Sequence, residues 1–233
     1  MIRPTLASAA LLALAGCSGK AGDSYVPVKA TPIPPAQVEK GKEASLLPFK
    51  VGNSWTYIAK TVVQIQNKQT SREAIVTFRI SKVEDVPGGR RATLELISNN
   101  KTVDRQVWMV NSRGIYQISI GTTKPRIFST PIPAILFPVE NGKKFSWTGS
   151  DGKTQMTYNF TVMGSQEVDT EEKRLAGIAI ESKGTSKSGK ITEKTDRTIW
   201  FTPGVGIVRI RESTLSNVGG SELLLSLKSH TVK

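Results

Sequence analysis

Short runs of alternating apolar and polar residues dominate the chain from about residue 55 to residue 232. In residues 155–162 the even positions are Met, Tyr, Phe and Val, whereas the odd positions are Gln, Thr, Asn and Thr. This period of two is typical of a β-strand with one buried and one exposed face. The pattern predicts no amphipathic helix longer than two turns. It predicts strands at about residues 55–65, 74–80, 91–98, 103–110, 114–120, 143–148, 155–162, 174–182, 191–201, 205–212 and 222–232.

Turn residues separate these runs and predict how they connect. Asn141-Gly142 and Asp151-Gly152 supply the positive φ angles that tight hairpins require. Strands joined by short turns favour an all-β fold, an antiparallel meander of about ten strands. The meander would form a curved open half-barrel, a closed barrel-like sheet or two packed sheets. Residues 131–139 contain three prolines, and we expect an apolar crossing or a short turn of helix there.

The amino-terminal segment has the layout of a secretory signal. Arg3 precedes an almost uncharged, apolar run from Thr5 to Gly16, which ends in small residues. This run is shorter than the roughly 20 residues that a membrane-spanning helix needs. We therefore predict that it directs export and is then removed.

The end of the run, Leu14-Ala15-Gly16-Cys17, resembles the lipobox of bacterial lipoproteins. That resemblance implies cleavage between Gly16 and Cys17, lipid on the Cys17 thiol, and attachment to a membrane through that lipid. The residue after the cysteine is Ser18 and not Asp. In Gram-negative lipoproteins this resembles the default routing, to the periplasmic face of the outer membrane. The alternative is an ordinary secreted protein with an incidental cysteine.

Composition divides the remainder into a tether and one domain. Residues 17–46 are rich in Gly, Ser and Pro, so they contain too little apolar surface to fold by themselves. Residues 47–233 carry the alternating runs and predict a single all-β domain. Cys17 is the only cysteine, so no disulfide within the chain supports this domain.

The chain is basic, with 32 Lys and Arg against 19 Asp and Glu and a net charge of +13. The densest basic stretch, within residues 183–197, is Lys183, Lys187, Lys190, Lys194 and Arg197. It predicts either the solvated face of a hairpin or attraction to anionic headgroups or acidic envelope sugars. Export and the lack of a stacking motif argue against nucleic acid as a partner.

Catalytic chemistry has few candidate residues. His230 is the only histidine, and its parity with Lys228 predicts an exposed position at the end of the last strand. Carboxylates cluster at Asp169, Glu171 and Glu172, in a turn-like stretch. There is no calcium-loop pattern, phosphate loop or nucleophile elbow, so we predict no enzyme, no metal site and no cofactor.

Two aromatic segments carry a second resemblance. Residues 48–57 read P-F-K-V-G-N-S-W-T-Y and residues 200–208 read W-F-T-P-G-V-G-I-V. They resemble segments of poorly characterised, β-rich bacterial envelope lipoproteins, which implies the fold more than a function. The aromatics fill a core or line a ligand-binding face. The candidates for such a face are Trp55, Tyr57, Phe78, Tyr158 and Phe160.

Three functions remain open. The first is a non-enzymatic envelope module that binds lipid or another apolar ligand on the inner face of the sheet. The second is a structural or assembly lipoprotein that docks onto an envelope protein or a cell-wall polymer. A hydrolase that uses paired carboxylates is the third and least favoured.

Overall fold

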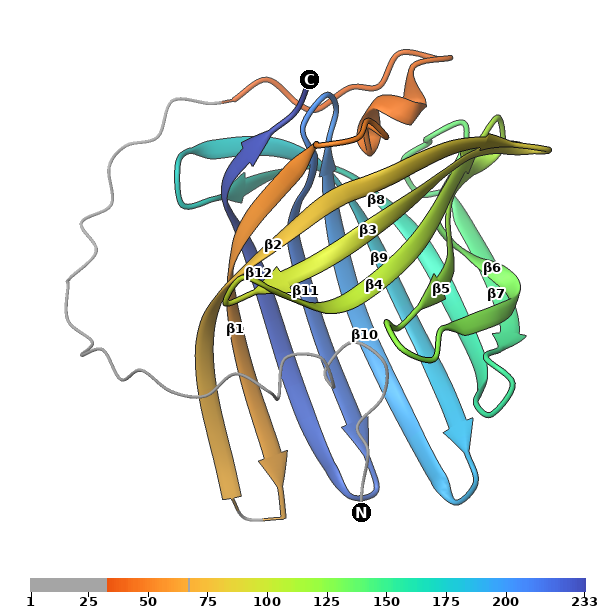
Figure 1. Ribbon diagram of the computed structural model, residues 1–233, viewed down its shortest axis with the longest axis vertical. Helices are drawn as coiled ribbons and strands as arrows, with labels where there is room; N and C mark the ends of the chain where they lie inside the picture. Colours follow the sequence, from red (N-terminus) through yellow and green to blue (C-terminus); the bar gives the residue numbers. More distant parts are fainter. Residues whose placement is uncertain (1–32, 67) are drawn as a thin grey trace.

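The computed structural model of the chain describes residues 33–66 and 68–233, so Gly16, Cys17 and the predicted signal peptide lie outside the described residues. The described part contains one short 3₁₀ helix, η1 (Glu43–Leu46), and twelve strands (Figure 1). The strands are β1 (Ser54–Ile65), β2 (Lys68–Val86), β3 (Gly89–Ser98), β4 (Lys101–Asn111), β5 (Gly114–Ile120), β6 (Arg126–Leu136), β7 (Lys144–Ser150), β8 (Gln155–Asp169), β9 (Arg174–Ser188), β10 (Ile191–Thr202), β11 (Gly206–Ser216) and β12 (Gly219–Thr231).

All twelve strands belong to one antiparallel sheet, which confirms the predicted all-β meander. Each strand pairs with its neighbours in the chain except that β6 does not pair with β7, and β1 also pairs with β12, giving the order β6-β5-β4-β3-β2-β1-β12-β11-β10-β9-β8-β7. The sheet curls into a nearly closed barrel, so that its two edges, β6 and β7, approach each other (Figure 1).

Side chains close the seam between these edges. The Ser150 N–H donates to Ser129 Oγ at 2.9 Å, and Arg126 Nη1 lies 3.3 Å from Asp151 Oδ2. The Phe128 and Trp147 rings meet edge to face across the seam. Because no backbone ladder joins β6 to β7, the seam is held more weakly than the rest of the wall.

Strand β6 corrects the expectation of a crossing or helical turn at residues 131–139. Pro131 and Pro133 lie inside this strand, which pairs on one side only, with β5. Proline cannot donate to a ladder, and an edge strand tolerates it because one side needs no donors. The prolines mark an edge strand here.

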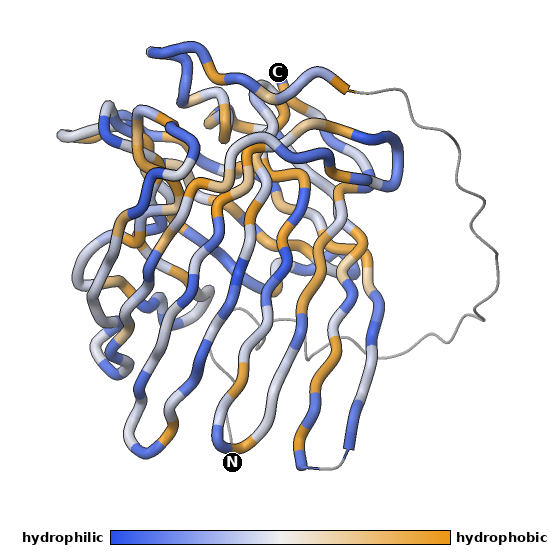
Figure 2. Tube along the Cα trace, turned by 180° about the vertical axis from the view of Figure 1, so that it is seen from behind, coloured by the Kyte–Doolittle hydropathy of each residue, from blue (hydrophilic) through white to orange (hydrophobic). Residues whose placement is uncertain are grey.

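The inward faces of the strands form the core. Figure 2 shows hydrophobic and hydrophilic segments alternating along the long strands. The largest fully buried side chains include Trp55, Tyr57 and Phe201, which come from β1 and β10. In the described part of the chain, no helix has both the length and the apolar character needed to cross a membrane.

Residues 33–46 lie against one end of the barrel. The Ala36 N–H donates to Ser165 Oγ at 2.7 Å, and η1 buries Leu46 completely. Val38 also packs against the core. The packed part of the chain therefore begins before Leu47, within the segment that the sequence assigns to the tether.

A bulge in the pairing of β1 with β12 changes the expected position of His230. Tyr57 pairs with Leu227 and Thr56 with Ser229, so Lys228 is the extra residue and His230 pairs with Trp55. Directly paired residues point to the same side of a sheet. The prediction that His230 is exposed is wrong, since its ring is half-buried and its Nδ1 is enclosed without a hydrogen bond to a described residue.

Candidate ligand site in the barrel interior

The two aromatic segments singled out in the sequence meet at the η1 end of the barrel. Trp55 Nε1 donates to the Val205 carbonyl at 2.5 Å, and the Tyr57 hydroxyl donates to the Ile207 carbonyl at 2.7 Å. Burial raises the pKa of the Tyr57 phenol well above its ordinary value. A side chain at Gly206 would collide with the Trp55 indole. These contacts join β1 to β11 and to the turn before it, over the intervening strand β12.

Away from that end, the inner surface changes from apolar to polar. On β10 the inward side chains run from Phe201 and Ile199 to Arg197, Thr195 and Glu193 toward the β9–β10 turn. On the neighbouring strands, the inward side chains also change from apolar to polar at the same height along the barrel. The inward hydroxyls there are Ser182, Ser186, Thr214 and Ser216.

An ion pair lies at the boundary between these layers. Arg197 and Glu212 are direct partners on β10 and β11, and Arg197 Nε lies 3.4 Å from Glu212 Oε2. The Glu212 side chain is 9% exposed and that of Arg197 is 29% exposed. Arg197 Nε is enclosed but has no hydrogen-bond partner among the described residues. The partly exposed guanidinium is therefore held beside Glu212 by charge and not by a hydrogen bond from Nε.

The opposite wall, on β4 and β5, presents amide groups. The Gln106 Oε1 atom accepts hydrogen bonds from Trp108 Nε1 at 3.0 Å and from Gln117 Nε2 at 3.1 Å. Asp104 is buried beside them, and desolvation raises the pKa of its carboxyl. Buried polar groups of this kind are costly unless paired, so their presence inside a barrel points to a polar ligand or to bound water.

Between the two walls lie two small cavities. The larger has a volume of about 100 Å³ and the smaller about 50 Å³, and Gln106, Trp108, Arg197 and Glu212 border both. The apolar side of the larger cavity comes mainly from β6 and β8 near the seam. It consists of Phe128, Ile132, Pro133, Ala134, Met156 and Phe160. The cavities thus have one apolar side and one polar side.

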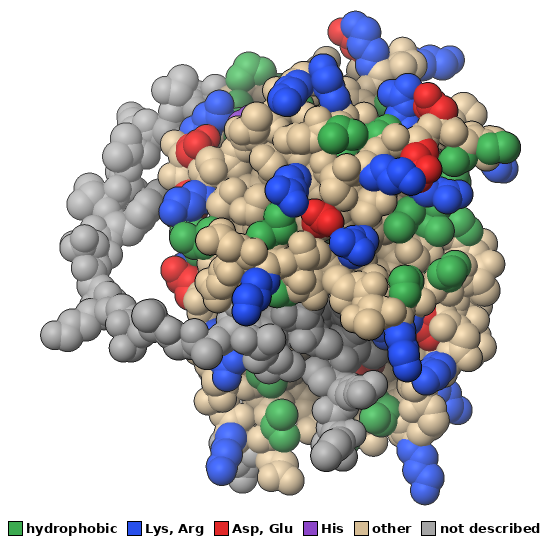
Figure 3. Space-filling model, viewed as in Figure 1, with side chains coloured by type: hydrophobic (Ala, Val, Ile, Leu, Met, Phe, Trp, Pro, Cys, Tyr) green, Lys and Arg blue, Asp and Glu red, His purple; other side chains and the backbone are tan. Residues whose placement is uncertain are grey.

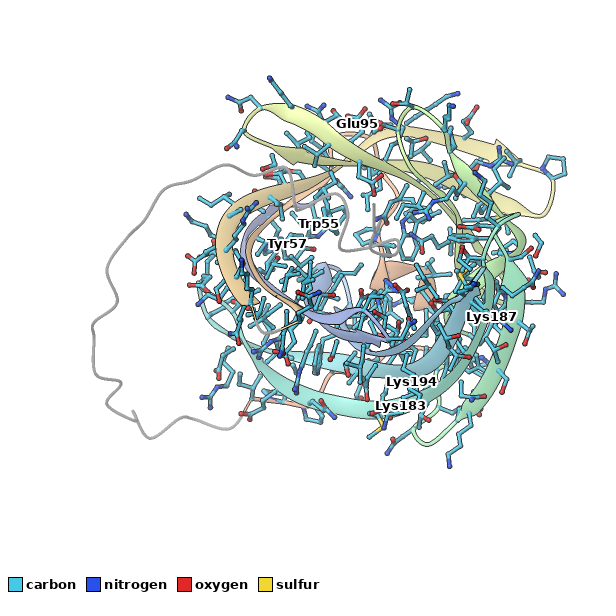
Figure 4. All side chains as sticks on the ribbon, turned by 90° about the horizontal axis from the view of Figure 1, so that it is seen from below. Trp55, Tyr57, Glu95, Lys183, Lys187 and Lys194 are labelled. Atoms are coloured by element: carbon cyan, nitrogen blue, oxygen red, sulfur yellow. The ribbon has the colours of Figure 1, made fainter. Side chains whose placement is uncertain are left out.

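Of the five aromatic residues predicted to line a ligand-binding face, three border a cavity and two do not. Tyr158 and Phe160 border the larger cavity and Phe78 borders the smaller, whereas Trp55 and Tyr57 border neither. Figure 4 looks into the ring of strands from below and shows Trp55 and Tyr57 inside it. The Phe160 ring stacks on Phe145 and the Tyr158 ring on Trp147, so the aromatic wall continues sideways from β8 onto β7.

The dense basic stretch separates into two faces of the sheet. Arg197 points inward, whereas Lys183, Lys187 and Lys194 are exposed on the outer face. Sequence reasoning missed Arg197, Glu212 and the two glutamines as interior residues. A signal was present, because Arg197 shares the parity of Ile199 and Phe201.

The carboxylates that the sequence singled out lie away from the cavities. Asp169 pairs with Arg174 at 2.8 Å in an exposed turn, and Glu171 and Glu172 belong to the same turn. No group of three His, Cys, Asp or Glu residues suited to a metal ion occurs in residues 33–66 and 68–233.

No protein-family model matches the chain, and no curated protein matches it. Three solved structures are similar to it. A candidate lipoprotein from Parabacteroides distasonis is 14% identical, with a TM-score of 0.49, over 78% of this chain and 98% of that one. A candidate exported protein with a YmcC-like fold from Bacteroides fragilis is 14% identical, with a TM-score of 0.45, over 79% and 98%. The hypothetical lipoprotein YmcC from Escherichia coli is 9% identical, with a TM-score of 0.36, over 80% and 95%.

Proposed function

We propose that the chain is a bacterial envelope lipoprotein, anchored through lipid on Cys17 at the periplasmic face of the outer membrane, and that its domain is a non-enzymatic binding module. The ligand is a small amphipathic molecule, or the end of a lipid. Its apolar part lies against Met156 and Phe160, and its polar group meets Arg197. The observation that carries this proposal is the interior cavity of about 100 Å³, which is apolar on one side and polar on the other.

The size of the cavity limits what it holds in this conformation. A volume of about 100 Å³ corresponds to about three water molecules in the liquid, whereas sites for drug-sized ligands occupy roughly 300–1,000 Å³. A whole lipid therefore requires the wall to widen. The seam between β6 and β7 is the place where widening breaks no ladder, and β6 itself borders the cavity. Ligand uptake through this seam follows from the same geometry.

The two interior carboxylates on β10 and β11, Glu193 and Glu212, are not placed like the pair of a hydrolase. Glu193 and Glu212 lie on neighbouring strands, but Glu212 pairs with Arg197, four residues along from Glu193. That offset is about 13 Å along the sheet. The two carboxylates of a glycosidase lie roughly 5–10 Å apart. Glu212 is also occupied by Arg197, and Ser186 donates to Glu193.

Native mass spectrometry with lipid extraction tests the proposal on the mature protein purified from a bacterial envelope. We expect a co-purifying small molecule at fixed stoichiometry. Ser182 borders the cavity, so Ser182→Leu fills it and abolishes that binding. Ser226→Leu adds the same volume on the outer face of β12 and leaves binding intact. A wild-type protein that carries no ligand, or equal binding by both variants, would contradict an interior site.

A groove on the outer face supports docking as a second function. Its volume is about 450 Å³, and most of the residues that line it are of polar types, including Thr157, Asn159, Lys183, Lys194 and Asp196. Such a surface suits a polar cell-wall polymer. We expect salt-sensitive sedimentation with purified cell wall, weakened by Asn159→Ala with Lys194→Ala and unaffected by Lys50→Ala. Sedimentation that neither variant changes would refute this groove as the contact.

A further inference from the structure

Three long hairpins end at the same level, at the end of the barrel away from η1. They are the β1–β2, β9–β10 and β11–β12 hairpins, whose turns form the lower edge of the molecule in Figure 1. We define the tip surface as residues 64–66, 68–69, 187–192 and 215–220. Neighbouring strands are about 4.8 Å apart, so the three adjacent tips extend over about 20 Å.

The charge on the tip surface has a single sign. It contains Lys68, Lys187 and Lys190, and no Asp or Glu. None of these lysines makes an ion pair with a carboxylate in the described part of the chain. Figure 3 shows basic side chains standing at the lower ends of the β1–β2 and β9–β10 hairpins. The tips therefore present uncompensated positive charge to whatever lies below them.

Exposed aliphatic side chains accompany the lysines. Ile65 is 51% exposed and Leu215 is 63% exposed, and they belong to the six large hydrophobic residues that are exposed in the described structure. Ile191 is half-buried at the β9–β10 turn, and Val218 is half-buried beside Leu215 at the β11–β12 turn. Aliphatic groups at a tip gain nothing in water, but they gain free energy when they enter an apolar phase.

The opposite end of the barrel has a different character. Its turns carry both signs of charge, and these form ion pairs, with Arg90 on Asp85 at 2.9 Å and Arg174 on Asp169 at 2.8 Å. The tip surface differs from this end in carrying lysines without any Asp or Glu.

We propose that the tip surface docks onto an anionic lipid bilayer. Its lysines meet the headgroups, and Ile65 and Leu215 enter the boundary between headgroups and acyl chains. An acidic polysaccharide complements the lysines but has no apolar phase to receive the aliphatic residues. The polar layer of the barrel interior lies toward the same end, so docking places the cavity beside the membrane surface. The docking itself requires no ligand in the cavity, so it does not depend on the proposed binding role.

The predicted anchor is compatible with this orientation. The described chain begins at Ile33, beside Ser165 and Glu167 at the η1 end. About 16 residues separate Ile33 from Cys17, and they span at most about 55 Å when extended. Strand β1, with 12 residues, is about 40 Å long. A lipid chain together with a basic surface also forms the two-signal anchor that gives stable membrane attachment.

Vesicle co-sedimentation tests the docking with the predicted mature chain, residues 17–233, carrying Cys17→Ser so that no lipid contributes. The probes are vesicles of phosphatidylcholine alone and vesicles that also contain phosphatidylglycerol. We expect binding to the anionic vesicles only, and weaker binding as salt rises. Each lysine near an anionic surface strengthens binding about fivefold, so Lys68→Gln, Lys187→Gln and Lys190→Gln together weaken it about 100-fold.

A matched control removes three lysines from the other end, by Lys50→Gln, Lys228→Gln and Lys233→Gln. This control has the same net charge, and we expect its binding to fall much less. Ile65→Ser with Leu215→Ser keeps every lysine and still weakens vesicle binding, while binding to soluble polygalacturonate stays unchanged. The proposal is overturned by equal binding to both kinds of vesicle, by equal losses in the tip and control variants, or by binding to polygalacturonate without binding to vesicles.

Discussion

Replacing Arg197 by methionine removes the cation that faces Glu212 and leaves that carboxylate inside the barrel. Removing one partner of a fully buried ion pair costs about 3–5 kcal/mol. Here the Glu212 side chain is 9% exposed and Arg197 is 29% exposed, so water already reaches part of the pair. We therefore expect Arg197→Met to lower the free energy of unfolding by about 2–3 kcal/mol. A domain with a stability of about 5–15 kcal/mol remains folded after such a loss.

The reciprocal variants distinguish the stabilisation by the ion pair from the cost of burying an unpaired charge. Glu212→Leu leaves a guanidinium that still reaches water, so we expect a smaller loss of about 1 kcal/mol. The double variant, Arg197→Met with Glu212→Leu, leaves no unpaired charge, and we expect its stability to lie within about 1 kcal/mol of the wild type. Urea unfolding followed by circular dichroism gives these values, provided that the m-values agree. If the losses of the two single variants simply add in the double variant, the residues do not interact, and the interior pair has no role in stability.

Three further predictions follow from other contacts. Tyr57→Phe removes the buried hydroxyl that donates to Ile207, and thermal unfolding should show a loss of about 1–2 kcal/mol; a loss below about 0.5 kcal/mol would mean that this bond is not holding β1 to β11. Glu95 accepts hydrogen bonds from Arg79 and Arg105, and the bond from Arg79 is the main cause that lowers the pKa of this carboxyl from its ordinary value of 4.5. Its stabilisation is therefore complete above pH 4.5 and is lost as the pH falls through the lowered pKa, so the deficit of Glu95→Gln in unfolding free energy should disappear in acid; a deficit that stays constant into strong acid would contradict the assignment. Cys17→Ser should move the protein from the membrane fraction to the soluble fraction, measured with tip-surface binding suppressed by high salt, and retention there would show that lipid on this residue is not the anchor.

Strand β8 shows how much of a strand the alternating pattern predicts. The sequence predicts a strand over residues 155–162, and the structure extends it to Asp169. The register shifts between Val162 and Gly164, and the alternation of buried and exposed residues is interrupted over residues 163–167 while the strand continues. A bulge depends on the partner strand, so a local pattern cannot contain it. The same reason explains His230, whose side of the sheet is set by a bulge opposite Thr56.

Arg197 shows how far the candidate site could be predicted from the sequence. In the sequence it belongs to a basic stretch with Lys194, and such stretches usually lie on a surface. Its position two residues before Ile199 places it on the inner face, but parity alone does not distinguish a buried cation from a solvated one at the end of a strand. The register of β10 with β11 brings Glu212 beside it, and the curvature of the sheet brings Gln106 opposite it.

The all-β class, the meander and the approximate positions of eleven of the twelve strands follow from the sequence alone, because period-two alternation and Gly-containing turns act over a few residues. The sequence also predicts the lipid anchor, since a lipobox is a local motif. The tertiary structure alone decided that β1 pairs with β12, that β6 is an edge strand, that the interior holds a polar pair beside a small cavity, and that three hairpin tips lie together. These features join residues far apart in the chain, and they depend on strand order, bulges and sheet curvature, which no local pattern specifies.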